Sequence, residues 1–414
     1  MWPCWQIHRA KVGEYLAAVG AVSQNNSAFP EVIIQAGYDL AMWAKRYMWR
    51  DYDWLLLGVV LLLMMGGVAM IYSATRGDPI IERLPLDQAV TGVIGLLFLF
   101  LMSGLDYRLF KMLAWPTYAF TLLILVLVLF VGVSHNEAQR WFDFGFFEVQ
   151  PGEIAKVLLS IFFAKFIADR DGRHSYISTA LISFLLLLPC VALILRQPNY
   201  STAITIVIIW AAIVFVGGVD RQYLIFAIAA AILLVVFVTQ FSDLLPDYVQ
   251  KRVTLFLDPN SALEADRYQQ TQALIALGSG GMLGQGFLQG LQSQLRYFPV
   301  RHTDFIFSVI GEELGFVGAL IFLVLLILVI VRSLRAALIA TDTFGRLLCT
   351  GIAATLFLQT YTNVAMQVGL APITGIVLPF VSYGRTSLLI VMLSIGLVES
   401  VAMRHKKLEF GREG

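Results

Sequence analysis

The sequence is poor in charged residues. Asp, Glu, Lys and Arg make up only 14% of its 414 residues, whereas an average soluble domain carries about 25%. The scarcity is concentrated in long runs with almost no charge, such as "WLLLGVVLLLMMGGVAMIY" and "YAFTLLILVLVLFVGV". Each run approaches the roughly 20 residues that a helix needs to cross the hydrocarbon of a bilayer. An ordinary soluble domain is therefore excluded.

Cysteine and histidine are scarce as well, with three and five residues. Cys4, Cys190 and Cys349 have neither paired nor metal-ligand spacing, and two of them lie in apolar runs, where a small apolar role is the default. No cluster of His and Cys indicates a zinc site, and no Ser-His-Asp arrangement is visible. The sequence also lacks a basic block that would suggest a nucleic-acid partner.

The long apolar runs predict an all-α, polytopic membrane protein. A β-barrel would instead show short segments of alternating hydrophobicity. We expect about ten transmembrane helices of the usual length. They fall near residues 54–73, 87–105, 112–132, 152–169, 177–195, 200–217, 221–240, 303–331, 344–364 and 376–400.

The distribution of Lys and Arg predicts the orientation in the membrane. If the N-terminus is cytoplasmic, the short outer loops carry only Arg76, Arg83, Arg140 and Arg196, and most other bases lie inside. Both termini are then cytoplasmic. Residues 51–414 form the membrane domain, and its one large loop, 241–302, is extracytoplasmic. Residues 1–50 form an N-terminal extension, either an amphipathic helix on the inner membrane surface or a solvated tail.

The large outer loop mixes apolar and amide residues, with Ala273, Leu274 and Leu277 on one helical face. This composition predicts short amphipathic helices at the outer interface, joined by the Gly-rich stretch "GSGGMLGQGFLQG". The stretch superficially resembles a phosphate-binding loop. No predicted strand precedes it, so a nucleotide site is disfavoured.

An acid and a base lie at the start of the fourth predicted span, in "NEAQRWFDFGFFEVQPGEIAKVLLS". Pro151 suits the first turn of a helix, and Glu153 lies near the positive end of its dipole. Glu153 and Lys156 are three residues apart, so they can pair on one face. A structural ion pair and a polar wall of a substrate cavity are both open, and they are compatible.

Two further groups of polar residues belong to the predicted outer side. The first is "RQPNYST", with Arg196 and Gln197 at the outer end of a tight helical hairpin; a polar interfacial turn explains it equally well. The second consists of loop bases that are either solvated or available to an outer-leaflet diphosphate. These bases are Lys251, Arg252, Arg267, Arg296 and Arg301.

Three acids occur in "VRHTDFIFSVIGEELGFVG". Asp304 lies at the outer start of its helix, and Glu312 lies eight residues further, or about 12 Å along the axis. A glycosidase pair needs about 5–9.5 Å, so Asp304 and Glu312 do not form a hydrolytic dyad. Glu313 faces another direction, because successive helical residues point about 100° apart. Asp304 is either a single general base or an acid that stabilises the helix dipole.

Four segments together resemble one known family. They are "RWFDFGFFEVQPGEIAKV", "RQPNYSTA", "YQQTQALIALGSGGMLGQGFLQGLQSQLRYFPVRHTDFIFSVIGEELGFVG" and "LPFVSYGRTSLL". They resemble the SEDS family (shape, elongation, division and sporulation), bacterial ten-span membrane proteins that polymerise lipid II. The resemblance covers roughly residues 53–405. Its loop wording is more similar to the RodA branch of cell elongation than to the FtsW branch of division.

The resemblance implies an inverting peptidoglycan glycosyltransferase. Lipid II would be the acceptor, a glycan on undecaprenyl diphosphate the donor, and a β-1,4 bond the product. The family's essential acid corresponds to Asp304, as the general base. The leaving diphosphate would need nearby cations or a divalent metal such as Mg²⁺ or Mn²⁺. The bases considered for this role are Arg140, Lys156, Arg196, Lys251 and Arg252.

Other family positions complete the expected substrate site. Trp141 matches an outer-loop tryptophan, Glu153 and Lys156 match a buried acid–base pair, and Gln150, His302, Thr303 and Ser382 lie in family motifs. Two positions depart from the family. Asn199 replaces an acid, and Arg385 replaces a glycine, which introduces a large cation where the backbone is expected to pass closely.

The resemblance also implies partners. A class B penicillin-binding protein would supply the peptide cross-linking, and the protein would lie in the bacterial cytoplasmic membrane with its active site on the outer face. Two other functions remain open. One is transport of lipid II across the membrane, and the other is a catalytically weakened scaffold for the penicillin-binding protein.

Overall fold

The computed structural model describes residues 49–135, 138–145, 147–171, 176–218, 264–295 and 301–405. The chain divides into two units, residues 1–52 and 53–414. Of the first unit only the end is described, where the short 3₁₀ helix η1 runs from Trp49 to Asp51. The possible interfacial helix in the N-terminal extension lies outside the described residues.

The described part of the second unit is built almost entirely from helices, which confirms the predicted fold class. Six of its described helices are long and apolar enough to cross a membrane. The predicted span 221–240 lies outside the described residues, so the number of spans stays a prediction. The helices are α3 (Trp54–Thr75), α4 (Leu84–Gly104), α5 (Leu109–Met112), α6 (Ala114–Val131), α7 (Pro151–Ala168), α8 (Tyr176–Arg196), α9 (Tyr200–Val216), α12 (Glu264–Ser279), α13 (Leu291–Gln294), α14 (Ile306–Ile339), α15 (Thr343–Gln367) and α16 (Arg385–Met403).

Several helix boundaries differ from the prediction; α14, for example, continues to Ile339 instead of ending at residue 331. Two of the differences concern the cavity described below. The helix α14 begins at Ile306, so Asp304 precedes the helix rather than lying within it. The last helix begins at Arg385 instead of residue 376. Residues 376–384 form a loop because Pro379 cannot continue a helix and Phe380 has a positive φ of 65°. Both loops contribute to the cavity described below.

A small antiparallel sheet between α6 and α7 was not predicted. Its strands are β1 (Val133–His135), β2 (Ala138–Asp143) and β3 (Glu148–Val149), in the order β1-β2-β3. In the register, Val133 is opposite Trp141, and Phe142 is opposite Val149. The sheet holds the segment that carries Arg140 and Trp141 next to the start of α7.

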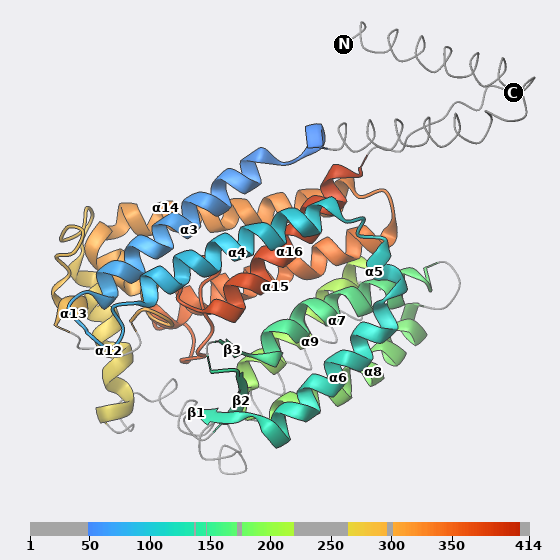
Figure 1. Cartoon of the computed structure of the whole chain (residues 1–414), viewed down its shortest axis with the longest axis horizontal. Coiled ribbons are helices and arrows are strands. Elements are labelled where there is room, and N and C mark those ends of the chain that lie inside the picture. The colour runs from blue at the N-terminus through green and yellow to red at the C-terminus, as the bar shows by residue number, and fades with distance from the viewer. Residues whose placement is uncertain are drawn as a thin grey trace, which may run out of the picture. The chain divides into compact units, whose positions relative to one another are not determined.

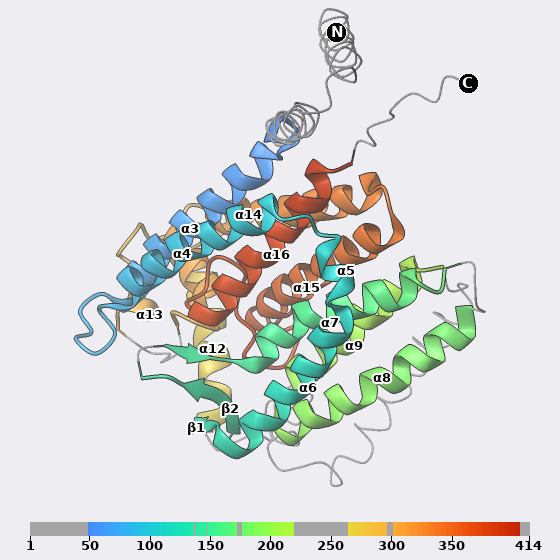
Figure 2. The ribbon, with the colours of Figure 1, turned by 45° about the vertical axis from the view of Figure 1, so that its right-hand side comes forward.

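The helices form two groups within the second unit. Figures 1 and 2 show α6, α7, α8 and α9 gathered on one side, and α3, α4, α14 and α16 on the other. The helix α15 packs against both groups, through α14 on one side and through α7 and α9 on the other. The sheet and the first turns of α7 lie where these groups meet.

The Gly-rich stretch packs on a kink in α14. Gly315 interrupts the helix with a φ of 69°, and Phe316 N donates to Gly281 O at 2.9 Å. A Cβ on Gly315 would lie 2.3 Å from Gly284 N, so this approach requires glycine. The helices α12 and α13 lie on either side of the stretch, as predicted, while their place at the outer interface stays a prediction. The Gly-rich stretch therefore has a structural role, since it connects α12 to α13 and packs on the kink of α14.

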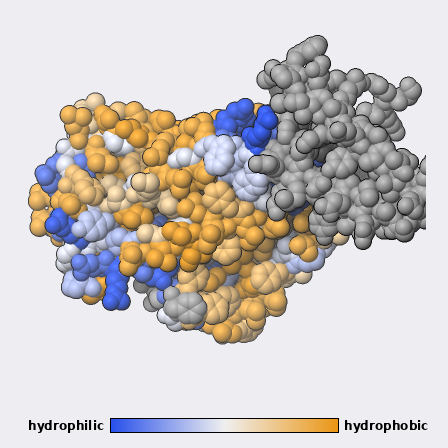
Figure 3. All heavy atoms as spheres, turned by 45° about the horizontal axis from the view of Figure 1, so that its top comes forward, coloured by the Kyte–Doolittle hydropathy of each residue, from blue (hydrophilic) through white to orange (hydrophobic). Residues whose placement is uncertain are grey.

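The surface matches a lipid environment. Figure 3 shows one face that is predominantly hydrophobic, with hydrophilic residues concentrated towards its ends. Large apolar side chains project outward from the long helices, such as Met65 with 65% exposure on α3 and Leu185 with 62% on α8. In lipid this exposure has no hydrophobic cost, because the acyl chains are as apolar as the side chains that contact them.

Candidate active site

A polar cavity of about 710 Å³ lies where α7, α9 and α16 begin. The residues that precede these three helices, Gln150, Asn199 and Gly384, all line it. The cavity is lined by Arg140, Trp141, Asp143, Gly145, Phe147, Glu148, Gln150, Glu153, Lys156, Asn199, Ser201, Thr202, Thr205, Thr303, Asp304, Thr374, Gly375, Ile376, Val377, Tyr383, Gly384, Arg385, Thr386 and Ser387.

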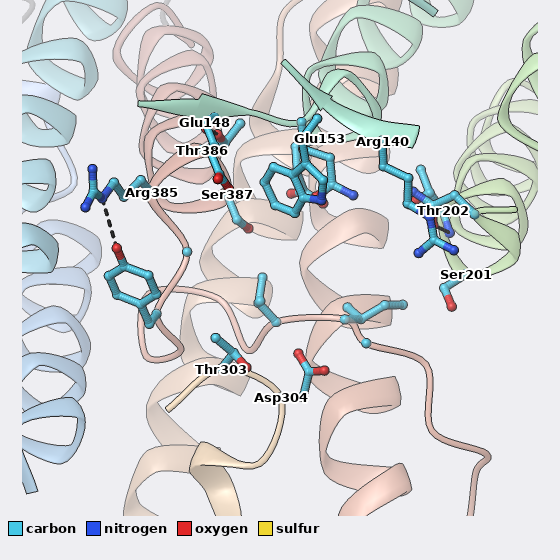
Figure 4. Close-up of a pocket in the computed structure, with 18 of the residues that line it drawn as sticks. Arg140, Glu148, Glu153, Ser201, Thr202, Thr303, Asp304, Arg385, Thr386 and Ser387 are labelled. Atoms are coloured by element: carbon cyan, nitrogen blue, oxygen red, sulfur yellow. Dashed lines mark hydrogen bonds between the residues drawn. The ribbon is translucent and has the colours of Figure 1, made fainter. Parts of the chain in front are cut away.

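Asp304 contributes a carboxylate to this cavity. It lies in the turn before α14, beside Thr303, and its peptide carbonyl accepts hydrogen bonds from Asn363 and Gln367 on α15. Figure 4 shows the carboxylate pointing into the cavity, across from Glu153 and Arg140. A Cβ added at Gly375 would lie 3.7 Å from Asp304 Oδ2, so the loop after α15 passes close to the acid.

Glu153 and Lys156 form the predicted ion pair. Lys156 Nζ lies 2.6 Å from Glu153 Oε1, and the two residues are 3% and 8% exposed. Gln359 on α15 donates to the second carboxylate oxygen at 3.5 Å. Both residues also line the cavity. The structural role and the cavity-wall role therefore coexist.

Arg140 links the sheet to the turn between α8 and α9. Its Nε donates to Gln197 O at 3.0 Å, and a second nitrogen donates to Pro198 O. Among the described residues no carboxylate pairs with it. Its neighbour Trp141 also lines the cavity, so the sheet presents a cation and an indole ring to the same space.

The turn itself contributes differently from expectation. Gln197 lies outside the lining residues, and its side chain donates to Leu125 O at 3.1 Å. Arg196 is exposed at the end of α8, also outside the lining. Asn199 does line the cavity and caps α9, with Oδ1 accepting from Thr202 N at 3.3 Å. An uncharged amide is sufficient for such a cap.

Arg385 has its partner on α4. Its guanidinium forms an ion pair with Asp87, and Nε donates to Tyr383 Oη at 2.9 Å (Figure 4). The side chain lines the cavity while remaining partly exposed. The cation of Arg385 is therefore accommodated by an acid of this chain.

Ser382 and His302 lie behind the cavity wall. Ser382 Oγ donates to Thr303 O at 2.6 Å and accepts from Leu378 N at 2.9 Å, which fastens the loop before α16 to the turn that carries Asp304. Tyr383 N donates to His302 O at 2.9 Å. Burial, reinforced by the charge of Arg301 and opposed by Asp78, lowers the pKa of His302 to about 4.

The remaining acids and bases lie elsewhere. Glu312 accepts from Gln292 N and Ser293 N at 2.6 and 3.1 Å, and Glu313 accepts from Ser73 Oγ and Leu288 N. Neither acid lines the cavity. Of the predicted loop bases, Arg301 donates to Ala74 O at 2.5 Å. Lys251, Arg252 and Arg296 lie outside the described residues, and the side chain of Arg267 is not described.

Sequence reasoning missed part of the lining. The segment Thr374 to Val377, the hydroxyls of Ser201 and Thr386, and the acids Asp143 and Glu148 were not singled out. Small polar residues in loops have no periodicity that marks them. The Pro- and Gly-rich stretch "APITGIVLPFVSYG" was the available signal, because it predicts an irregular segment inside a membrane protein.

The described residues of the cavity do not form a complete set of metal ligands. In the part of the chain that the structure describes, no group of three or more His, Cys, Asp or Glu residues could hold one. The carboxylates of Asp143, Glu148 and Asp304 line the cavity separately. Mg²⁺ commonly binds through one or two carboxylates together with substrate phosphates, and this donor set fits that mode.

The fold and the cavity define a polytopic α-helical membrane protein with a polar site at the ends of its helices. Residues 53–407 match the model of the FtsW/RodA/SpoVE family of cell cycle proteins. The chain belongs to this family, as its motifs predicted, and is an integral membrane protein.

Named relatives extend over most of the chain. MrdB of Escherichia coli (strain K12), a peptidoglycan glycosyltransferase, is 35% identical over 352 residues, which cover 84% of this chain and 93% of MrdB. FtsW of Geobacter sp. (strain M18), a probable peptidoglycan glycosyltransferase, is 34% identical over 370 residues, covering 86% and 98%. A chain in the structure of a peptidoglycan synthase complex that coordinates polymerization and crosslinking has a TM-score of 0.74 and 33% identity, covering 86% and 98%.

Proposed function

We propose that this chain is a peptidoglycan glycosyltransferase that polymerises lipid II, with Asp304 as its general base. The observation that carries the assignment of the base is the carboxylate of Asp304 in the 710 Å³ cavity, at the position expected from the family motif. Glu153, the buried acid of the cavity wall, is paired with Lys156.

The reaction needs one proton acceptor. The C4 hydroxyl oxygen of the acceptor GlcNAc forms a bond to the anomeric carbon of the donor glycan. The bond from that carbon to the diphosphate oxygen breaks, and its electron pair leaves on undecaprenyl diphosphate. The hydroxyl proton passes to Asp304, and the anomeric carbon is inverted. A positioned base typically contributes about 10²–10⁴-fold to such a step.

The leaving diphosphate needs positive charge. Arg140 is the best-placed cation, because Lys156 and Arg385 are already paired with carboxylates. The helices α7, α9 and α16 also direct their positive dipole ends towards the cavity, which favours an anion there. A divalent cation held by a cavity carboxylate and the diphosphate would act in the same direction. Arg196 lies outside this arrangement, and Lys251 and Arg252 stay candidates from the sequence alone.

The sugar-binding residues are proposed from the lining. Trp141, Gln150 and Thr303 face the same space as Asp304, whereas His302 and Ser382 support it from behind. We place the cavity on the outer face of the membrane with both termini cytoplasmic, as the distribution of Lys and Arg predicts.

The proposed partner is based on a related protein, and the proposed pathway on a sequence motif. A class B penicillin-binding protein is the proposed partner, supported by the related chain in a complex that couples polymerization with crosslinking. We favour elongation over division from the wording of the loop motif. The similar identities to MrdB and FtsW do not separate the two branches.

The test is polymerisation of purified lipid II by this protein together with its transpeptidase partner, whose cross-linking is blocked. Wild type and Asp304→Asn are compared on a glycan gel, with Glu82→Gln as a control that changes an exposed carboxylate outside the cavity. We expect a ladder from wild type and from the control, and none from Asp304→Asn. A normal ladder from Asp304→Asn would remove the base assignment. No ladder from a well-folded wild-type complex would favour transport or a scaffold.

A further inference from the structure

Two amide side chains on α15 hold the peptide of Asp304. Asn363 Nδ2 lies 3.0 Å from Asp304 O, and Gln367 Nε2 lies 3.2 Å from the same oxygen. Asn363 and Gln367 are one helical turn apart, and both are fully buried. Their own amides are joined, because Gln367 Nε2 also donates to Asn363 Oδ1 at 2.7 Å.

The orientation of both amides is fixed by groups that have only one role. Asp304 O can only accept, so each amide nitrogen must face it. Ser308 N can only donate, and it lies 2.6 Å from Gln367 Oε1. Flipping Gln367 would therefore break two contacts at once. The network has one satisfied arrangement, which makes it rigid.

Gln367 also binds the first turn of α14, through Ser308. Phe305, the residue before the helix, provides no side-chain cap. The amide of Ser308 in the first turn donates to Phe305 O at 3.1 Å and also to Gln367 Oε1 of the neighbouring helix at 2.6 Å. This cap from outside the segment stabilises the start of the helix directly after Asp304.

Asn363 also binds the loop that passes beside Asp304. A further hydrogen bond runs from Asn363 Nδ2 to Ile376 O, at 2.8 Å. Ile376 and its neighbour Gly375 line the cavity, and Gly375 lies next to the Asp304 carboxylate. One side chain thus ties the turn that carries the acid to the loop that passes beside it.

We propose that Asn363 and Gln367 are positioning residues, which fix the carboxylate of Asp304 relative to the loop of residues 374–377. Neither amide lines the cavity. Their effect passes through the peptide of Asp304 and the loop, so they set the geometry of proton transfer while leaving substrate contacts intact. The proposal rests on Asp304 being the general base.

The test uses two near-isosteric variants, Gln367→Met and Asn363→Leu, which remove the donors and keep the bulk. We expect kcat for lipid II polymerisation to fall by about 10–10²-fold in each, since small misplacements at a reacting centre can cost about 10²-fold. KM for lipid II should stay within about twofold of wild type, because uniform binding is not removed.

The matched control is Thr360→Val. Thr360 lies on the same helix, one turn before Asn363, and its buried hydroxyl has no hydrogen-bond partner in the described part of the chain. It should leave kcat and KM unchanged. Thermal melting is recorded for every variant, and rates are compared at a temperature at which each is fully folded. A lower rate then reports the position of Asp304 and not a loss of folded protein.

Either of two results would overturn the proposal. One is a wild-type kcat in both amide variants, and the other is a rise in KM with kcat unchanged, which would place the amides in substrate binding. Failure of the proposed function looks different. In that case Asp304→Asn itself polymerises normally, whatever the amide variants do.

Discussion

Lys156 Nζ lies 2.6 Å from Glu153 Oε1 in the first turns of α7, and both side chains are almost completely buried. Each charge is stabilised mainly by the other, because burial leaves it little contact with water. Replacing one member of a buried pair typically costs about 3–5 kcal/mol. We therefore expect Glu153→Ala and Lys156→Ala to lower the melting temperature in detergent markedly.

The same helix offers a matched control for this pair. Lys165 Nζ also lies 2.6 Å from an acid, Asp169 Oδ2, but these side chains are 21% and 36% exposed. Exposed pairs contribute only about 0–1 kcal/mol, so Lys165→Ala should change melting little. Equal melting for all three variants would mean that burial does not strengthen the dependence of Glu153 and Lys156 on each other.

Glu312 should matter for folding and leave the chemistry alone. Its carboxylate accepts from the amides of Gln292 and Ser293 in the first turn of α13. Glu312→Ala leaves these amides without an acceptor, at a cost of about 1–3 kcal/mol for each buried group. We expect a lower melting temperature and near-normal polymerisation per folded molecule, measured by lipid II assay at a permissive temperature.

The comparison with Asp304 makes this prediction decisive. Asp304→Asn should show the reverse pattern, with normal melting and no polymerisation. If Glu312→Ala melts like wild type and makes no glycan, Glu312 belongs to the reaction, and the contacts to α13 are secondary.

Arg385 and Asp87 should contribute little to stability. Their side chains are 29% and 36% exposed, a range in which ion pairs contribute about 0–1 kcal/mol. Arg385→Gln, Asp87→Asn and the double variant should therefore melt within a few degrees of wild type. Because Arg385 already has Asp87 and Tyr383 as partners, we expect Arg385→Gln to retain polymerisation with an unchanged KM. A large rise in KM would show that the guanidinium binds substrate instead.

The sequence predicted those parts of the fold that depend on local pattern. Long apolar runs located α3, α4 and α6 to within a few residues of their bounds. The strand segment around Arg140 was missed because six residues of β2 are too short for alternation to stand out. The start of α16 was misplaced because apolar residues continue through Pro379, and a hydropathy pattern alone does not register a proline.

Site residues with unusual chemistry inside a recognisable motif were predictable from the sequence. Residues that reach the cavity only through tertiary contacts were not. Asp304, Trp141 and the pair on α7 were singled out as unusual groups beside a membrane span. Thr374 to Val377 became lining residues through a hydrogen bond from Asn363, which lies 13 residues earlier than Ile376. The side-chain amide of Gln197 points into the protein and donates to the carbonyl of Leu125 on α6. Such tertiary hydrogen bonds cannot be predicted from a sequence pattern.

The last prediction concerns pH and His302. The pKa of this side chain is lowered to about 4, mainly by burial, whereas an unfolded histidine titrates near about 6.5. Above pH 6.5 the imidazole is neutral in both states and stability does not depend on it. Between pH 6.5 and 4 only the unfolded chain takes up the proton, so the folded state loses stability as the pH falls.

At pH 5 the loss is about 2 kcal/mol relative to pH 7, at 1.36 kcal/mol per unit. Other carboxylates titrate in this range, so the readout is the difference between wild type and His302→Asn. We expect that difference in the free energy of unfolding to shift by this amount, in favour of the variant, between pH 7 and pH 5. Parallel pH profiles for the two proteins would show that His302 accepts its proton in the folded state as readily as in the unfolded one.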